Sequence, residues 1–268
     1  MKSISIIFIA LVILFSCNKE SSVEDVTKTA CDSLKQGLLK PNVSDTFRLL
    51  SCIKISYCDS IRLGLLKFNQ DSRSLDCNSI IIGSQKWMTK NLDVITYGNG
   101  DTIPQVTDKN KWSTLTTGAW CYYNNDSNNN AIYGKLYNWY AVTDSRGLAP
   151  KGWHIPSDGE WTQLSDKLGG LKLAGGKMKT TNYWKIPNFG ATNSSGFSGL
   201  PAGFRSGSSG NFGFLGESTF WWSSTEYLNP NNNDNTFAHS RTLNFNDTTL
   251  GKVVGYKNNG VSVRCLKD

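Results

Sequence analysis

The hydrophobic pattern at the start of the chain predicts an export signal. Ile4–Phe15 is almost wholly apolar and follows the positive charge of Lys2. The run is too short to span a bilayer, but it suits the hydrophobic segment of a signal peptide. Leu14-Phe15-Ser16-Cys17 matches a bacterial lipoprotein cleavage pattern, so Cys17 is predicted to carry lipid and to anchor the protein in the outer membrane. Which face of that membrane it takes stays open. A plain secretory leader or an uncleaved anchor would also export the chain.

One stretch of the pattern has the period of an amphipathic helix. Ser157 and Glu160 stand in the order of a capping box, in which each residue's side chain accepts a hydrogen bond from the other's backbone N–H. Apolar residues then recur every three or four positions until Gly169-Gly170. These apolar residues are Trp161, Leu164 and Leu168. The sequence therefore predicts a helix from residue 157 to residue 168.

The rest of the body has the pattern of short strands and polar loops. Ile80–Ile82 and Lys86–Met88 are separated by Gly83-Ser84-Gln85 and predict a hairpin. Tyr133–Val142 predicts a buried element, but its aromatic spacing does not distinguish helix from strand. Further strand-like segments are residues 199–205, 220–224, 237–245 and 260–265. A few helices with many short strands and long loops predict an α+β domain.

Two similar cysteine-containing segments precede this domain. Cys31–Lys40 returns with close similarity as Cys58–Lys67, and a further cysteine follows each copy. The predicted export places the chain in an oxidising compartment, where cysteines pair. The simplest pairs are Cys31 with Cys52, Cys58 with Cys77, and Cys121 with Cys265. Crossed pairings between the two copies stay open. No CxxC motif is present in the sequence, which argues against a zinc ribbon or a thioredoxin-like site.

These features divide the chain into four parts. Residues 1–17 are the predicted signal peptide with its lipidated cysteine, 18–30 a polar tether, 31–77 two short helical cysteine repeats, and 78–268 the main domain. The tether lacks aromatic residues, as expected of a spacer. The formal charge of +7 is scattered along the chain without a run of five basic residues. This distribution argues against a nucleic-acid partner.

The main domain carries a series of aromatic- and glycine-rich motifs. They are Ile82–Leu92 (IGSQKWMTKNL), Tyr133–Trp139 (YGKLYNW), Gly152–Trp161 (GWHIPSDGEW), Gly203–Arg205 (GFR), Trp222–Thr225 (WSST) and Ser262–Cys265 (SVRC). In this order they resemble the Fibrobacter succinogenes major paralogous (FISUMP) domain across residues 77–267. The resemblance implies an extracellular domain, commonly carried on lipoproteins and secreted chains, from a family without an established biochemical activity.

A more distant resemblance concerns the fold. His154–Trp161, Trp222–Glu226 and Val263–Cys265 are similar in order to motifs of formylglycine-generating-enzyme-like domains. This similarity implies a compact C-type-lectin-like architecture with short strands, few helices and long loops. The enzymes of that group bind copper through a cysteine pair near the C-terminus, whereas this chain has only Cys265 in that region. The resemblance therefore does not carry their oxidase activity to this chain.

Candidate catalytic groups are few. The only histidines are His154 and His239, and neither is spaced to meet a nucleophile or a second metal ligand. Ser223-Ser224 lacks the Gly-x-Ser-x-Gly pattern of a hydrolase. Helix capping and the helix dipole account for the neighbouring acids Asp158 and Glu160. We therefore predict no catalytic residue, no resident cofactor and no enzymatic activity.

Two asparagine-rich loops are the candidate binding sites. In the first, alternating oxygen-bearing side chains suit Ca²⁺, although the tract has a single acid and also suits an ordinary solvated loop. Its candidate metal ligands are Asn124, Asp126, Asn128 and Asn130. The second loop follows an aromatic segment, and its amides suit sugar hydroxyls. Its candidate ligand-binding residues are Asn231, Asp234 and Asn235.

These observations favour an exported recognition module that binds a glycan, a peptide or a partner protein. They rest on the predicted export, the lipid contact with the membrane and the scarcity of catalytic patterns. A structural envelope component without a small-ligand site is the alternative. An enzyme of the formylglycine-generating-like group comes third.

Overall fold

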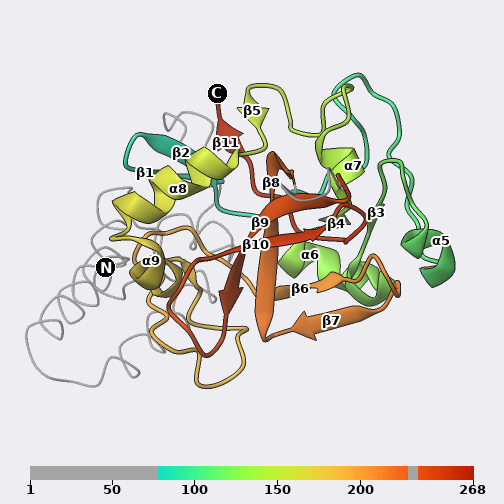
Figure 1. The fold of residues 1–268 in the computed structure, drawn as a ribbon. Coiled ribbons are helices and arrows are strands. Elements are labelled where there is room, and N and C mark those ends of the chain that lie inside the picture. The colour runs from blue at the N-terminus through green and yellow to red at the C-terminus, as the bar shows by residue number, and fades with distance from the viewer. Residues whose placement is uncertain (1–77, 229–234) are drawn as a thin grey trace, which may run out of the picture. The chain divides into compact units, whose positions relative to one another are not determined.

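The computed structural model describes residues 78–228 and 235–268, which lie in the compact unit Cys77–Asp268 (Figure 1). Several predictions fall outside the described residues. They are the signal peptide with Cys17, the tether 18–30, the repeats 31–77 with Cys31, Cys52, Cys58 and Cys77, and the loop residues Asn231 and Asp234. Within the described residues, no helix is long and apolar enough to cross a membrane.

The first sheet joins the beginning of the domain to its end. β1 (Ser79–Ile82) and β2 (Gln85–Met88) form the predicted antiparallel hairpin, and Gly83 takes the left-handed φ of +65° that their tight turn requires. β11 (Leu266–Lys267) pairs with β2 on one side and with β5 (Trp153–His154) on the other. The order β1-β2-β11-β5 therefore places residues from both ends of the domain beside the middle of the chain.

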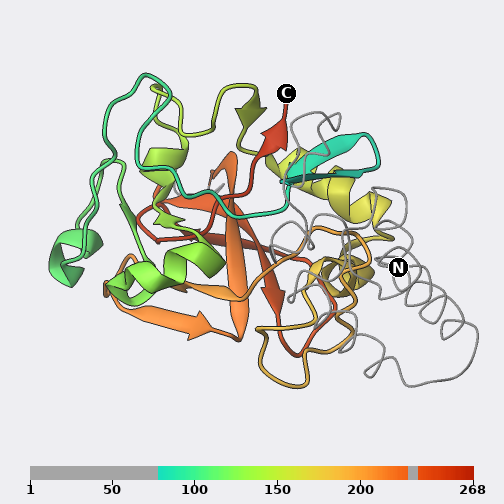
Figure 2. The same cartoon turned by 180° about the vertical axis from the view of Figure 1, so that it is seen from behind.

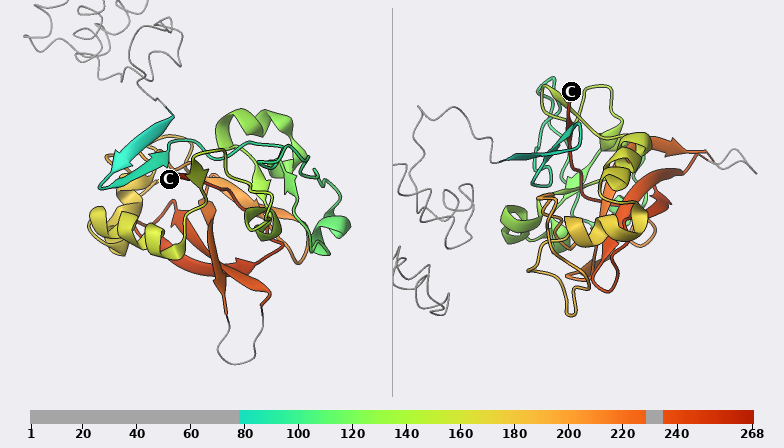
Figure 3. Two further views of the ribbon diagram at one scale, coloured as in Figure 1. Left: turned by 90° about the horizontal axis from the view of Figure 1, so that it is seen from above. Right: turned by 90° about the vertical axis from the view of Figure 1, so that its left-hand side faces the viewer.

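A second, five-stranded sheet has the order β10-β9-β8-β6-β7. Its strands are β6 (Ala202–Arg205), β7 (Phe212–Leu215), β8 (Ser218–Tyr227), β9 (Phe237–Asn244) and β10 (Gly251–Tyr256). β8 and β9 are antiparallel and run together to one edge of the domain (Figure 3). A two-stranded sheet consists of β3 (Trp120–Cys121) and β4 (Leu136–Tyr137). The mixture of short strands and helices confirms the α+β prediction.

The helices of the described residues are short. They are α5 (Lys109–Ser113), α6 (Asn130–Tyr133), α7 (Trp139–Val142), α8 (Asp158–Lys167) and α9 (Leu171–Met178), with 3₁₀ turns at Tyr123–Asn125 and Ser127–Asn129. α8 confirms the predicted helix, because both halves of the capping box between Ser157 and Glu160 are present. The ambiguous stretch Tyr133–Val142 contains the end of α6, then β4, then α7. Viewed from behind, α6 lies near β6 and β7 (Figure 2).

α9 was not predicted, because two glycines inside it lower helix propensity. Close packing explains both. A Cβ on Gly175 would lie 2.7 Å from the carbonyl oxygens of Thr248 and Thr249, and one on Gly176 would lie 2.5 Å from that of Gly190. Side chains are therefore excluded at these two positions, and the helix packs directly on neighbouring backbone.

Three clusters of buried side chains form the core. Tryptophan dominates them, and Trp153 is the only tryptophan that is not buried. In the second cluster, Trp161 lies with its ring centroid 4.7 Å from that of Trp87 and 6.0 Å from that of Trp221. The core is therefore aromatic rather than aliphatic, as expected of a domain rich in glycine and asparagine.

The predicted pairing of Cys121 with Cys265 is wrong, since both are free thiols in the structure. Cys121 packs against Trp112 and Leu136 in the third cluster, whereas Cys265 belongs to the first cluster with Trp139. Burial raises the pKa of each thiol to about 12, so both stay protonated and unreactive at neutral pH.

The predicted strand at residues 260–265 is also replaced by a different arrangement. Val261 bridges to Tyr137 and Ser262 bridges to Trp221 as isolated pairs, and the regular strand β11 begins only at Leu266. The segment connects different sheets instead of lying within one.

Candidate functional site

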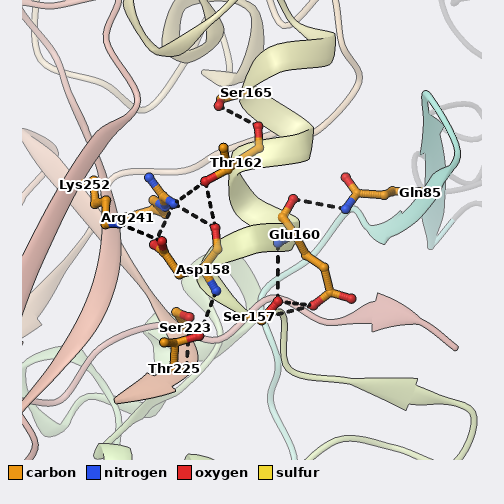
Figure 4. A network of polar contacts seen from close by, with 10 residues as sticks. All are labelled: Gln85, Ser157, Asp158, Glu160, Thr162, Ser165, Ser223, Thr225, Arg241 and Lys252. Carbon is orange, nitrogen blue, oxygen red and sulfur yellow. Dashed lines mark hydrogen bonds and ion pairs between the residues drawn. The ribbon is translucent and has the colours of Figure 1, made fainter. Parts of the chain in front are cut away.

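A network of polar contacts surrounds the N-terminus of α8 (Figure 4). Asp158 Oδ1 lies 2.6 Å from Arg241 Nη2, and Asp158 Oδ2 lies 2.7 Å from Lys252 Nζ. Arg241 Nη2 also donates to the Asp158 carbonyl oxygen and to Thr162 Oγ1. The Arg241 side chain is only 1% exposed. The ion pair therefore attaches the start of α8 to β9 and β10.

A second group of contacts lies on the other side of this helix start. The Ser157 N–H and hydroxyl both donate to Glu160 Oε2 at 2.8 Å. His154 Nε2 lies 2.9 Å from Glu160 Oε1, and His154 Nδ1 lies 2.8 Å from Asp268 Oδ1. Gln85 Nε2 donates to the Glu160 carbonyl oxygen at 3.0 Å, which attaches β2 to the same turn. His154 is thus held between two carboxylates from α8 and the end of the domain.

The pKa of His154 follows from these contacts. Partial burial disfavours the charged imidazolium, but the hydrogen bonds and charges of Asp268 and Glu160 outweigh burial and raise the pKa. For Glu160, burial acts upward, whereas hydrogen bonds from Ser157 and His154 outweigh it and lower the pKa. The imidazolium and its carboxylates therefore stabilise one another's charged forms.

We expect His154 to make stability depend on pH. Because its folded-state pKa is raised, its contribution is fully present below the unfolded value of about 6.5 and is lost as the pH rises through the folded value. Urea unfolding at a series of pH values from about 5 upward should show the largest difference between wild type and His154→Gln at the acidic end.

The other histidine gives a matched control of opposite sign. Burial lowers the pKa of His239, so its contribution falls as the pH drops below about 6.5. Wild type should therefore lose stability at acidic pH through His239, and the His239→Gln variant should lack this loss. A difference between wild type and His154→Gln that does not change with pH would contradict the assigned role of His154.

Two buried arginines from the sequence motifs are bound by backbone oxygens and aromatic rings. Arg264 donates to the carbonyl oxygens of Met88 and Phe197 and to Asn91 Oδ1, and its guanidinium lies 4.5 Å from the Phe197 ring centroid. Arg205 is equally buried. It donates to the carbonyl oxygens of Val106, Thr107 and Gly210, with its guanidinium 4.4 Å from the ring centroid of Trp112. None of these hydrogen-bonding partners is a carboxylate.

Asn91 of the first motif links several segments. Its Oδ1 accepts from Trp221 Nε1 at 2.9 Å as well as from Arg264, and its Nδ2 donates to the Tyr133 carbonyl oxygen and to Ser262 Oγ. Three motif segments, Ile82–Leu92, Tyr133–Trp139 and Ser262–Cys265, therefore meet with Trp221 at one amide.

In the predicted calcium loop, side-chain oxygens of two candidate ligands accept hydrogen bonds from groups of the protein. Asp126 Oδ1 accepts from the Asn128 N–H and caps a 3₁₀ turn. Asn130 Oδ1 accepts from the ammonium of Lys135 at 3.1 Å, and that positive charge opposes a cation nearby. Asn124 has a φ of +53°, which asparagine tolerates in turns. These contacts support a solvated turn more than a metal site, and the calcium hypothesis remains a prediction.

Of the second loop, the structure describes only Asn235. This residue is exposed just before β9 begins. Asn231 and Asp234 lie outside the described residues, so the predicted ligand contact of this loop stays a prediction.

The contacts of the polar network fix the start of α8 to neighbouring segments. In a Ser–His–acid catalytic array the imidazole would contact the serine hydroxyl. Here the Ser157 hydroxyl donates to Glu160, and both nitrogens of His154 contact carboxylates. Ser223 is buried, and its hydroxyl accepts from the Thr225 N–H. Among the described residues, no group of three or more His, Cys, Asp or Glu side chains is placed to hold a metal ion.

Sequence reasoning missed two partners in this network. Asp268 lies 114 positions from His154, and Arg241 lies 83 positions from Asp158. No local periodicity connects residues so far apart. Pairing of β5 with β11 produces the first contact, and packing of α8 on β9 produces the second.

Comparison with known proteins gives one match. The family model described as Fibrobacter succinogenes major domain matches residues 80–267, which is more than half of the chain. No curated protein and no solved structure matches.

Proposed function

Because the chain belongs to the Fibrobacter succinogenes major domain family, we propose that it is an exported, lipid-anchored recognition module that binds a glycan, a peptide or a protein. In this proposal, Cys17 carries the lipid and the domain acts at the outer membrane. The domain has the C-type-lectin-like architecture. Its first and last strands share one sheet while long loops connect the strands between them, which supports this architecture.

The proposal is supported chiefly by the burial of motif side chains, which form hydrogen bonds inside the domain. Arg205 and Arg264 are buried and donate to backbone carbonyl oxygens, and the buried Asn91 accepts from Trp221 Nε1 and from Arg264. Asn138 is likewise buried, and its Oδ1 accepts from the N–H groups of Ala119 and Ala141. Since the motifs hold the framework together, the surface loops are left to provide specificity, as in other recognition scaffolds.

A glycan array tests this proposal. The purified protein without lipid is applied to polysaccharides and oligosaccharides in the presence of Ca²⁺ and again with a chelator. We expect saturable binding to a subset of sugars. Hits that vanish with chelator would support the loop with Asp126, whereas hits that persist would support recognition without the metal. A blank array from folded protein would contradict glycan recognition and favour the structural envelope role.

A further inference from the structure

Two pairs of contacting aromatic rings each include one ring exposed on the surface of the domain. We refer to Tyr133, Tyr183, Phe204 and Phe214 as the aromatic surface. Tyr183 and Phe214 are 53% and 52% exposed. The Tyr183 ring contacts the Tyr133 ring at a centroid distance of 6.5 Å, and the Phe214 ring stacks on the Phe204 ring at 5.8 Å.

Backbone contacts hold the two ring pairs on neighbouring segments. The Lys185 N–H donates to the Gly216 carbonyl oxygen at 2.7 Å, so the segment that follows Tyr183 lies against the turn between β7 and β8. Lys185 Nζ also pairs with Glu217 Oε1 at 2.7 Å across the same contact. Phe214 lies in β7, two residues before Gly216, so both exposed rings stand on segments that contact each other.

The backbone at both exposed rings takes an unusual conformation. Tyr183 has a φ of +69° and Phe214 a φ of +63°. The other described non-glycine residues with positive φ are asparagines and one serine, namely Asn124, Asn125, Asn188, Asn193 and Ser198. A bulky side chain is strained in this region, whereas glycine is not. Two large rings at positions that would suit glycine indicate that the rings serve a purpose other than folding.

The chemistry of this surface fits a neutral sugar chain. Flat aromatic rings pack against the C–H face of a pyranose, and the tyrosine hydroxyls donate and accept hydrogen bonds as sugar hydroxyls do. Lys185 and Glu217 neutralise each other, so this ion pair leaves no net charge to attract an anionic headgroup. We infer that the aromatic surface binds a neutral polysaccharide by stacking sugar rings on Tyr183 and Phe214. This inference rests on the proposed function and names its site and ligand class.

Glycine substitutions separate binding from folding. Tyr183→Gly and Phe214→Gly each remove a ring and also relieve the strained φ, so the melting temperature should stay the same or rise. The same variants should bind neutral hexasaccharides about tenfold or more weakly, because an exposed stacking ring is lost. Isothermal titration with cellohexaose, chitohexaose, mannohexaose and maltohexaose measures the affinity, and thermal unfolding measures the stability.

Tyr256→Ala is the matched control. Tyr256 is 48% exposed on β10 and contacts Phe237, and β10 and β7 form opposite edges of the five-stranded sheet. Its loss should leave sugar affinity unchanged. Loss of affinity in Tyr256→Ala but not in the two glycine variants would overturn the inference and move the site to β9 and β10.

Further outcomes separate this inference from the proposed function. If wild type binds sugars on the array and both glycine variants bind them equally well, the assignment of the surface fails while the proposed function stands. If wild type binds no sugar in either assay, glycan recognition itself fails. If the glycine variants instead lose binding to phosphatidylcholine vesicles, the rings contact lipid and the sugar assignment is overturned.

Discussion

Arg264→Lys should lower the free energy of unfolding by about 3 kcal/mol or more, a large part of the total stability of an ordinary domain. The guanidinium is fully buried and makes hydrogen bonds to three oxygen atoms, at distances between 2.6 and 3.2 Å. Burial lowers its pKa to about 9, so the group is still charged at neutral pH. A lysine ammonium lacks the planar fork that contacts these oxygens together, and it leaves part of this set unsatisfied.

The same substitution on the surface gives the comparison. Arg146 forms hydrogen bonds with Asp144 and Asp101, but its side chain is 40% exposed. Solvent screens an exposed ion pair of this kind, so Arg146→Lys should be close to wild type in stability. Urea unfolding of both variants measures the difference. If Arg264→Lys is as stable as Arg146→Lys, Arg264 does not hold the motif segments together.

The difference between these arginines shows which parts of the structure can be predicted from the sequence. Local signals were sufficient for the β1–β2 hairpin and for α8, since a turn glycine and a capping box act within a few residues. Arg264 gives no such signal, because a basic residue in a polar-looking segment is usually exposed. Its burial depends on Asn91 and Phe197, which are 173 and 67 positions away.

The candidate sites likewise could be predicted only where their signal is local in the sequence. The sequence drew attention to asparagine-rich loops, where composition is visible. The aromatic surface was not predicted, since it combines rings from α6, the segment before Trp184, β6 and β7. The left-handed φ of Tyr183 and Phe214 is also invisible in the sequence, because neither residue type favours it. Tertiary packing determines both features.

Asp158→Asn is the second substitution with a large expected effect. The asparagine keeps the shape of the side chain but removes the charge that faces Arg241, whose side chain is 1% exposed. Removing one partner of a buried ion pair leaves an uncompensated charge, so the free energy of unfolding should fall by about 3 kcal/mol. The first turn of α8 also loses a negative charge that favours the helix dipole.

A double-mutant cycle measured by urea unfolding isolates the pair. Arg241→Met removes the buried charge itself, so Asp158→Asn should cost much less in that background than in wild type. Asp101→Asn is the matched control, because Asp101 pairs with Arg146 at an exposed position and its loss should lower stability far less than Asp158→Asn. If the two asparagine variants lose similar stability and the cycle shows no coupling, the ion pair does not attach α8 to the five-stranded sheet. A strong coupling would instead show that this long-range contact, which joins residues 83 positions apart, fixes the helix that the local sequence signals specify.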